Sequence, residues 1–253
     1  MENKKRIIQG YLECDGSIMR ISSLEDIKNF LLKYGKENQE LSEEELNVLT
    51  QKVQDSNVLE KDDCNIGYSN NPLVLQHGVT VENYKIKEGT IAIADEAFAL
   101  KNWSNNSQYC LKSIQLPDTV IAIGHSAFIG KRNLRGINYP KSLIRIGDAA
   151  FSGCSNLEIV VFPKSIKYIG THAFQNTSIR VIVIPDNVQK IGSFAFAGCP
   201  KLESIEFKGV PGTIGSEVFG NCPALKEIVI PQGTADYFEK ELFPISKELF
   251  VEK

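Results

Sequence analysis

The stretch LKSIQLPDTVIAIGHSAFIGKRN, residues 111–133, decides the fold, because the chain returns to its pattern again and again. Its opening pattern, an aliphatic residue with isoleucine or valine three positions later, starts afresh at Leu134, Leu157, Ile179, Leu202 and Leu225. A second marker, Ile-Gly followed by Ala-Phe, keeps the same phase in most of these units. Successive units are 22 or 23 residues apart, and such fixed spacing identifies an internal repeat.

Each unit predicts one coil of a solenoid. The β-branched residues of the opening segment predict a short strand whose first, fourth and sixth residues point inward, and the proline that usually follows ends that strand. Ile-Gly lets the backbone turn without a Cβ penalty, and the phenylalanine of Ala-Phe fills the centre of the coil. Since one coil cannot bury these side chains alone, we expect about seven coils to stack on a shared core.

The succession of leucine, isoleucine, proline, Ile-Gly, Ala-Phe and cysteine over residues 84–243 resembles the BspA-type leucine-rich repeat family. The family's cysteine position holds Cys154, Cys199 and Cys222, whereas Lys131 and Thr177 replace it in two units. The resemblance implies an α/β repeat solenoid, a right-handed leucine-rich repeat superhelix of about seven coils of about 23 residues. It also implies adhesion, because members on bacterial and protist surfaces adhere to host or neighbouring-cell proteins.

The chain divides into three predicted parts. Residues 1–75 lack the repeat and form an N-terminal capping or appended segment, residues 76–243 form the solenoid, and residues 244–253 form a C-terminal tail. A cap is the simpler interpretation of the first part, because a terminal coil would otherwise expose its core. The alternative is an independent functional domain.

Residues 1–75 are predicted to contain a hairpin and two helices. Asp15-Gly16 is a favoured tight-turn pair and predicts a hairpin between residues 6–13 and 17–21. Helical spacing of apolar residues predicts one helix over residues 22–34 and another over residues 42–53, the second beginning with a capping box. Residues 55–71 are polar, and we expect them to form a linker.

Composition bounds the class of protein. With 42% hydrophobic residues in 253 the chain can bury a sizeable core, and a formal net charge of -3 gives no indication of a nucleic-acid partner. The charge is segregated, however, because residues 110–201 carry eleven basic and four acidic side chains. This basic band favours an anionic partner.

The sequence contains no recognisable catalytic, metal-binding or membrane-spanning motif. The six cysteines fit no zinc spacing and the three histidines lie far apart, so we expect no enzyme activity, metal or cofactor. No apolar run is long enough for a membrane span, and the N-terminus has no apolar signal core. As it stands the chain would be cytoplasmic. The alternative, from the resembled family, is a secreted or cell-surface protein.

The outward strand positions of two central units are unusually apolar. Residues two, three and five of each opening strand should face solvent, and most units place polar or small residues there. The units at Leu157 and Ile179 instead place Ile159 and Val161, and Val181 and Val183, at these positions. We expect a square of aliphatic side chains on adjacent strands, which is typical of a partner site. The alternative is that β-branched residues are simply good strand formers.

Two further features are candidates for partner binding. The insertion at residues 100–109 interrupts the period and contains Trp103, the only tryptophan, in a setting typical of a binding loop or of a loop folded back on the first coils. Basic residues also recur in phase along the band, where they either contact an anionic partner or only solvate the surface. These residues are Lys141, Arg145, Lys164, Lys167 and Lys190.

The leading hypothesis from the sequence is a non-catalytic protein-binding module, an adhesion or interaction protein that presents a solenoid surface. An alternative is a structural component that self-associates or tethers a cell-surface assembly. A third is that residues 1–75 are an effector segment which the repeats target.

Overall fold

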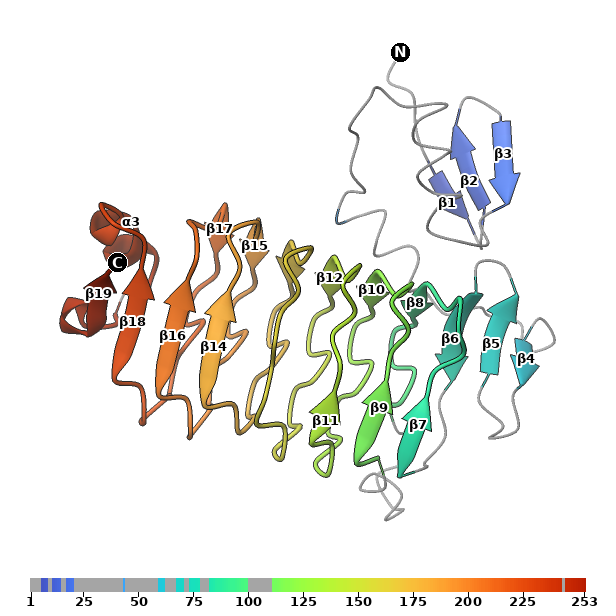
Figure 1. Cartoon of the computed structure of the whole chain (residues 1–253), viewed down its shortest axis with the longest axis horizontal. Helices are drawn as coiled ribbons and strands as arrows, with labels where there is room; N and C mark the ends of the chain where they lie inside the picture. Colours follow the sequence, from blue (N-terminus) through green and yellow to red (C-terminus); the bar gives the residue numbers. More distant parts are fainter. Residues whose placement is uncertain are drawn as a thin grey trace.

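The computed structural model describes residues 6–8, 11–14, 17–20, 43, 59–61, 67–70, 73–77, 82–99, 111–242 and 244–253. The repeats form an elongated array of stacked coils in which parallel strands pair from coil to coil (Figure 1). The predicted leucine-rich repeat solenoid is therefore confirmed. The array has little helix among these residues, since the coils are closed by turns rather than helices.

The opening segments of the coils lie on one side of the array. In all described coils but the one at residues 157–163 they form strands, and with the C-terminal strand β19 these strands belong to two separate sheets, β7-β9-β11 and β14-β16-β18-β19, each paired in parallel. We call their outer side the first-strand face. Their bounds are β7 Asn83–Lys85, β9 Ser113–Gln115, β11 Gly136–Ile137, β14 Val181–Ile184, β16 Ser204–Phe207, β18 Glu227–Ile230 and β19 Phe250–Glu252.

The second strand of each coil contributes to a single nine-stranded sheet, whose outer side we call the second-strand face. Six of these strands come from consecutive coils, and three more, β6, β5 and β4, extend the sheet beyond β8. The bounds are β4 Leu59–Lys61, β5 Gly67–Asn70, β6 Leu73–His77, β8 Ala92–Ile93, β10 Ala122–Ile123, β12 Arg145–Ile146, β13 Tyr168–Ile169, β15 Lys190–Ile191 and β17 Thr213–Ile214.

Several local expectations need correction. The described repeats build six full coils, and the seventh supplies only β18 before helix α3, Ala235–Glu241. Residues 55–71 are not simply a linker, because β4 and β5 lie within them and pair antiparallel. The last ten residues form a short 3₁₀ helix, Lys247–Leu249, and strand β19, which pairs with β18 and covers the sheet edge.

The predicted N-terminal hairpin is confirmed in part. Strands β2, Tyr11–Cys14, and β3, Ser17–Arg20, pair antiparallel on either side of Asp15-Gly16. A second reversal separates β2 from β1, Arg6–Ile8, so the single first strand that we expected is two. The helix expected at residues 22–34 lies outside the described residues. The helix expected at residues 42–53 also lies outside them, apart from Glu43, which is helical.

The core is a column of stacked phenylalanine rings along the axis of the array. The fully buried rings of Phe128, Phe151, Phe174 and Phe196 follow one another with centroids 5.1, 5.2 and 5.4 Å apart and nearly parallel planes. The alanine before each ring is also fully buried, and aliphatic side chains from both strands surround the column. The prediction that phenylalanine fills each coil is therefore confirmed.

The repeated glycine serves a different purpose from the one that the sequence suggested. Gly170 does not adopt a positive φ; the left-handed residue comes two positions later, at His172, where φ is 56°. A Cβ on Gly170 would lie 2.5 Å from the amide nitrogen of Asp148 and from the carbonyl carbon of Gly147, in the preceding coil. Glycine is needed here because the two backbones approach closely.

Candidate functional site

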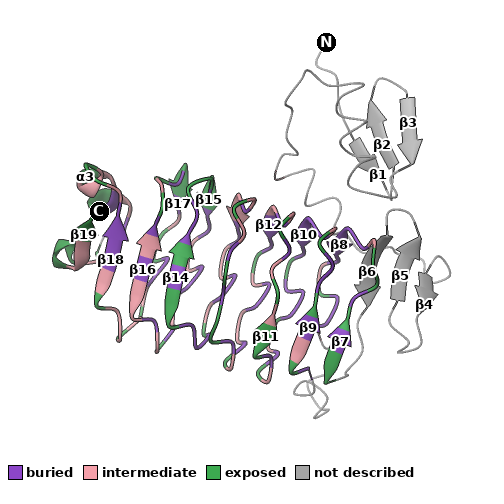
Figure 2. Ribbon diagram, in the orientation of Figure 1, coloured by how far each residue is buried: buried purple, intermediate pink, exposed green. Residues whose placement is uncertain are grey.

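The four aliphatic residues on the first-strand face are exposed. The exposed fractions are 71% for Ile159, 69% for Val161, 54% for Val181 and 39% for Val183, in a protein whose other large hydrophobic side chains are mostly buried. The alternation of exposed and buried residues along β14 is visible in Figure 2. We call these four residues the aliphatic patch.

The backbone under the aliphatic patch differs from the expected pair of adjacent strands. Val181 and Val183 belong to β14, which pairs with β16 so that Val183 lies beside Glu206. Residues 157–163, which carry Ile159 and Val161, form no strand in the described part of the chain, although Val160 and Phe162 still point inward. The patch therefore lies where the two first-strand sheets are separated.

Charged side chains border the aliphatic patch. Lys201 Nζ lies 2.8 Å from Glu158 Oε1, and Lys226 Nζ lies 2.9 Å from Glu203 Oε2. The hydrogen bonds from these lysines, together with their positive charge, lower the pKa of each carboxyl group. Such exposed pairs add little stability, so their main contribution is a polar border around the apolar centre.

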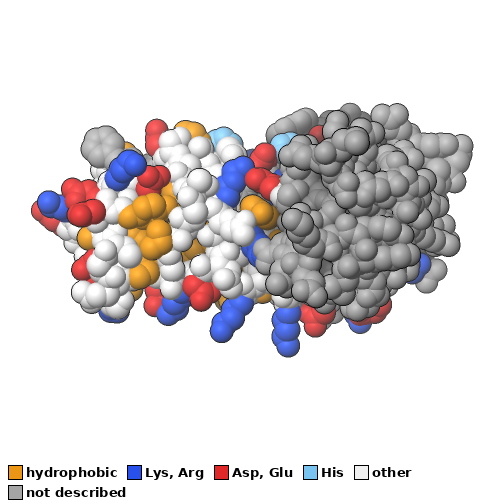
Figure 3. Space-filling model, turned by 90° about the horizontal axis from the view of Figure 1, so that it is seen from above, with side chains coloured by type: hydrophobic (Ala, Val, Ile, Leu, Met, Phe, Trp, Pro, Cys, Tyr) orange, Lys and Arg blue, Asp and Glu red, His pale blue; other side chains and the backbone are white. Residues whose placement is uncertain are grey.

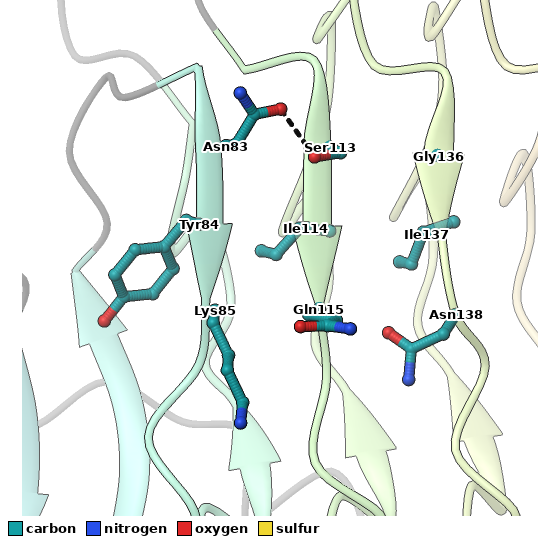
Figure 4. Close-up of a pocket in the computed structure, with 9 residues that line it drawn as sticks. All are labelled: Asn83, Tyr84, Lys85, Ser113, Ile114, Gln115, Gly136, Ile137 and Asn138. Carbon is teal, nitrogen blue, oxygen red and sulfur yellow. Dashed lines mark hydrogen bonds between the residues drawn. The ribbon is translucent and has the colours of Figure 1, made fainter.

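An open hollow of about 700 Å³, lined by both polar and apolar side chains, lies on the neighbouring part of the array, over β7, β9 and β11 (Figure 4). Small residues, Ser113 and Gly136, stand side by side there, and the Ser113 hydroxyl donates a hydrogen bond of 2.6 Å to the Asn83 side chain. The Asn138 side chain bonds instead to the backbone of Leu116, through both its oxygen and its nitrogen. This region offers polar contacts beside the apolar ones of the patch.

The predicted basic residues do not form one surface. Lys141 and Lys164 are exposed, whereas Lys167 is half-buried. Arg145, on the second-strand face, is only 5% exposed, and Lys190 Nζ forms an ion pair of 2.8 Å with Glu43 Oε2. Viewed from above, charged side chains of both signs are scattered over the described part of the array (Figure 3). Trp103 lies outside the described residues, so its role remains a prediction.

The cysteines stack inside the array. Cys154 and Cys199 are buried and Cys222 is half-buried, and all three are free thiols. Each sulfur lies 3.2 to 3.4 Å from the carbonyl oxygen of a phenylalanine in the preceding coil. The thiols thus satisfy backbone acceptors. Where Thr177 replaces cysteine, its hydroxyl instead donates a hydrogen bond to the carbonyl oxygen of Phe174 in its own coil.

We predict that Cys154 resists alkylation in the native protein. Burial raises the pKa of this thiol to about 12, although Lys131 opposes the shift. At pH 8 the reactive thiolate is therefore about one part in ten thousand, and the core also excludes the reagent. Iodoacetamide followed by peptide mass spectrometry should find Cys154 unmodified in the native protein and fully modified in urea. Rapid native labelling would contradict its assigned burial.

The described residues hold no group of three histidine, cysteine, aspartate or glutamate side chains that could bind a metal ion. No helix in this part of the chain is both long and apolar enough to cross a membrane. The geometry that stands out is therefore a surface: one face carries an exposed aliphatic patch, a charged border and an open hollow of mixed lining.

Comparisons with known proteins agree with this architecture. A family model described as "BspA type Leucine rich repeat region (6 copies)" matches residues 76–190 and 167–249. A leucine-rich repeat protein of Bacteroides ovatus is similar in structure, with 27% identity and a TM-score of 0.52 over 70% of this chain and 46% of that one. The leucine-rich repeat protein of T. pallidum has 23% identity and a TM-score of 0.53, over 76% of this chain and 97% of that one. No curated protein matches.

The present chain spans about half the length of the Bacteroides ovatus protein, as the 46% coverage shows. The T. pallidum likeness, at 23% identity, supports the fold alone. The family match covers most of the chain and includes every repeat unit from β8 to α3.

Proposed function

Because the chain belongs to the BspA-type leucine-rich repeat family, we propose that it is a non-catalytic protein-binding module whose aliphatic patch contacts a protein partner. The observation that carries this proposal is the exposure of Ile159, Val161, Val181 and Val183 on a single face. The repeats of this family are consistent with interaction or adhesion. More specifically, we propose that the chain mediates adhesion at a cell surface.

The chemistry of the patch favours a protein over a small ligand. Four aliphatic side chains offer contact area but little directional hydrogen bonding, which suits a partner that buries its own apolar residues. The ion pairs of Glu158 and Glu203 lie at the border, where charges contribute orientation and specificity more than affinity. An apolar centre with a charged border is the usual anatomy of a protein interface.

We predict that the double substitution Val161→Lys with Val183→Lys removes partner binding and leaves the fold intact. Both side chains point to solvent, so the melting temperature should change by no more than about two degrees. Two ammonium groups at the centre of an apolar interface would have to be desolvated, which should weaken binding by about a hundredfold or more. The measurement is capture of host and self proteins on the immobilised chain, with affinities then determined for each purified partner.

The matched control is Gln232→Lys with Thr213→Lys, which adds the same charge at exposed positions away from the patch and the hollow. Partners retained by the control and lost from the patch variant support the proposal. Partners retained equally by both would move the binding surface elsewhere. Light scattering of the unaltered chain tests the structural alternative, since concentration-dependent dimers that the patch substitutions abolish would identify a second copy as the partner.

A further inference from the structure

The second-strand face changes in residue type and in burial along the array. One residue from each strand points outward in register, and these residues run in the order Ala92, Ala122, Arg145, Tyr168, Lys190 and Thr213. The isoleucine that follows each of them points into the core. We call these six residues the outer row.

Burial along the outer row falls from one end to the other. Ala92 and Ala122 have no exposed surface, Arg145 is 5% exposed, Tyr168 is half-buried, and Lys190 is exposed. Figure 2 shows the same change: both residues of β8 and of β10 are buried, whereas β15 and β17 each have one exposed and one buried residue. An alanine on the outer side of a sheet is too short to bury itself, so something must cover this end of the row.

The sequence supports the same conclusion independently. The position before each outer-row residue holds Ile91 and Ile121 in the first two coils, both with no exposed surface, and Gln189 and Gly212 in the last two. Apolar residues at both positions are expected only where the face is covered, because a solvated face would carry polar residues. The covered region thus extends across β8 and β10 to β12.

Glu43 lies beyond this covered region, at the exposed end of the outer row. Its carboxylate forms the 2.8 Å ion pair with Lys190, 147 residues later in the chain. Arg145 lies two strands away on the same row, and its Nε and Nη1 atoms are buried without a hydrogen-bond partner. Burial lowers the pKa of Arg145, and the charges of Asp148, Glu43 and Asp95 oppose this shift. Glu43 is therefore close to the outer row.

The two described residues on either side of the following segment, Glu43 and Leu59, lie far apart on the same sheet. Glu43 is beside β15, whereas Leu59, sixteen residues later, begins β4 at the far end of the same nine-stranded sheet. Seven strand spacings separate β15 from β4, or about 34 Å. A helix of twelve residues followed by four extended residues spans about 31 Å, which matches the helix that the sequence predicts for residues 42–53.

We propose that residues 42–54 of this chain dock along the outer row of the second-strand face, with Glu43 on Lys190 and with their apolar side chains over Ala122 and Ala92. The apolar stripe of the predicted helix, Leu46, Leu49 and Val53, complements the apolar end of the row. Its carboxylates complement the basic end. The N-terminal part of the chain thus covers a face of the solenoid in addition to extending its sheet.

A cross-link tests this placement in the full chain. A water-soluble carbodiimide, which joins a carboxylate directly to an amine in contact with it, should link Glu43 to Lys190 within one molecule, because Lys190 Nζ lies 2.8 Å from Glu43 Oε2. Peptide mass spectrometry identifies the linked peptides. The link should be lost in the control Lys190→Arg, whose guanidinium keeps the positive charge but does not form this amide. No cross-link, or one only between two molecules, would overturn intramolecular docking.

A second variant tests the apolar end. Ala122→Asp places a carboxylate under the docked segment, so trypsin cleavage after Lys52 should accelerate at least tenfold relative to the unaltered chain. Thr213→Asp, at the exposed end of the same row, should leave the rate unchanged. Cleavage after Lys52 that is already as fast in the unaltered protein as in urea would contradict the proposal. The cross-link decides the matter if Ala122→Asp fails to fold.

Discussion

Gly170→Ala is expected to destabilise the array by at least about 3 kcal/mol, a large share of the stability of a typical domain. The new Cβ would lie 2.5 Å from two backbone atoms of the preceding coil, the amide nitrogen of Asp148 and the carbonyl carbon of Gly147. Neither atom can turn away as a side chain could. The same strands are joined by the hydrogen bond from Gly170 to Ile146, 2.9 Å long, which separation of the coils would break. Urea denaturation measures the loss.

The control for this substitution is Gly136→Ala. Its Cβ would meet nothing nearer than the Ser113 Cβ at 3.7 Å, which is ordinary van der Waals contact. We expect the free energy of unfolding to stay within about 0.5 kcal/mol of that of the unaltered protein. Equal losses for the two variants would show that glycine itself, rather than close coil packing, determines the effect.

Phe174→Ala is expected to cost about 3 to 5 kcal/mol and to unfold neighbouring coils together. Its ring is fully buried between Phe151 and Phe196, at centroid distances of 5.2 and 5.4 Å, and meets Phe162 edge-on at 5.6 Å. Removing the ring leaves a cavity that both adjacent coils share. Because each coil is stabilised mainly by its neighbours, hydrogen exchange should accelerate in the coils on both sides.

Phe194→Asn in the next coil provides the comparison. Phe194 is half-buried, stacks on His172 at 5.0 Å and has a φ of 58°, a conformation that asparagine tolerates well. We expect a loss below about 1 kcal/mol. If Phe174→Ala lowered the melting temperature by only a degree or two, the assignment of the phenylalanine column to the core would be wrong.

The sequence predicted the solenoid because its pattern is local and repeated. The spacing of Ala127-Phe128 and Ala150-Phe151 assigned these side chains to the core, and the alternation around Val181 and Val183 assigned these two to the surface. Each assignment depends only on which way a residue points within its own coil. Every unit carries this information, so an assignment that is ambiguous in one unit can be made from the equivalent positions of the others.

The remaining features depend on contacts between distant segments. The glycine requirement at Gly170 comes from the backbone of another coil, and the burial of Arg145 comes from cover over its face. Residues 55–71 resembled a linker because the strands β4 and β5 within them are short and polar, and these strands are held by the pairing of β4 with β5 and of β5 with β6. The apolar pairs Ile91-Ala92 and Ile121-Ala122 did indicate a covered face, because a strand with one solvated face needs only alternate apolar residues, and here two consecutive residues are apolar and buried.

The separation of the two first-strand sheets at residues 157–163 makes the array mechanically unequal on its two sides. The second-strand sheet continues through this region by the pairing of β12, β13 and β15, so its hydrogen bonds resist extension there. The first-strand side has no ladder across that coil in the described residues and yields more easily to bending. The curvature of the array should therefore change mainly at Ile159 and Val161. The affinity of a partner bound there would depend on this curvature, and its binding would in turn favour one curvature over others.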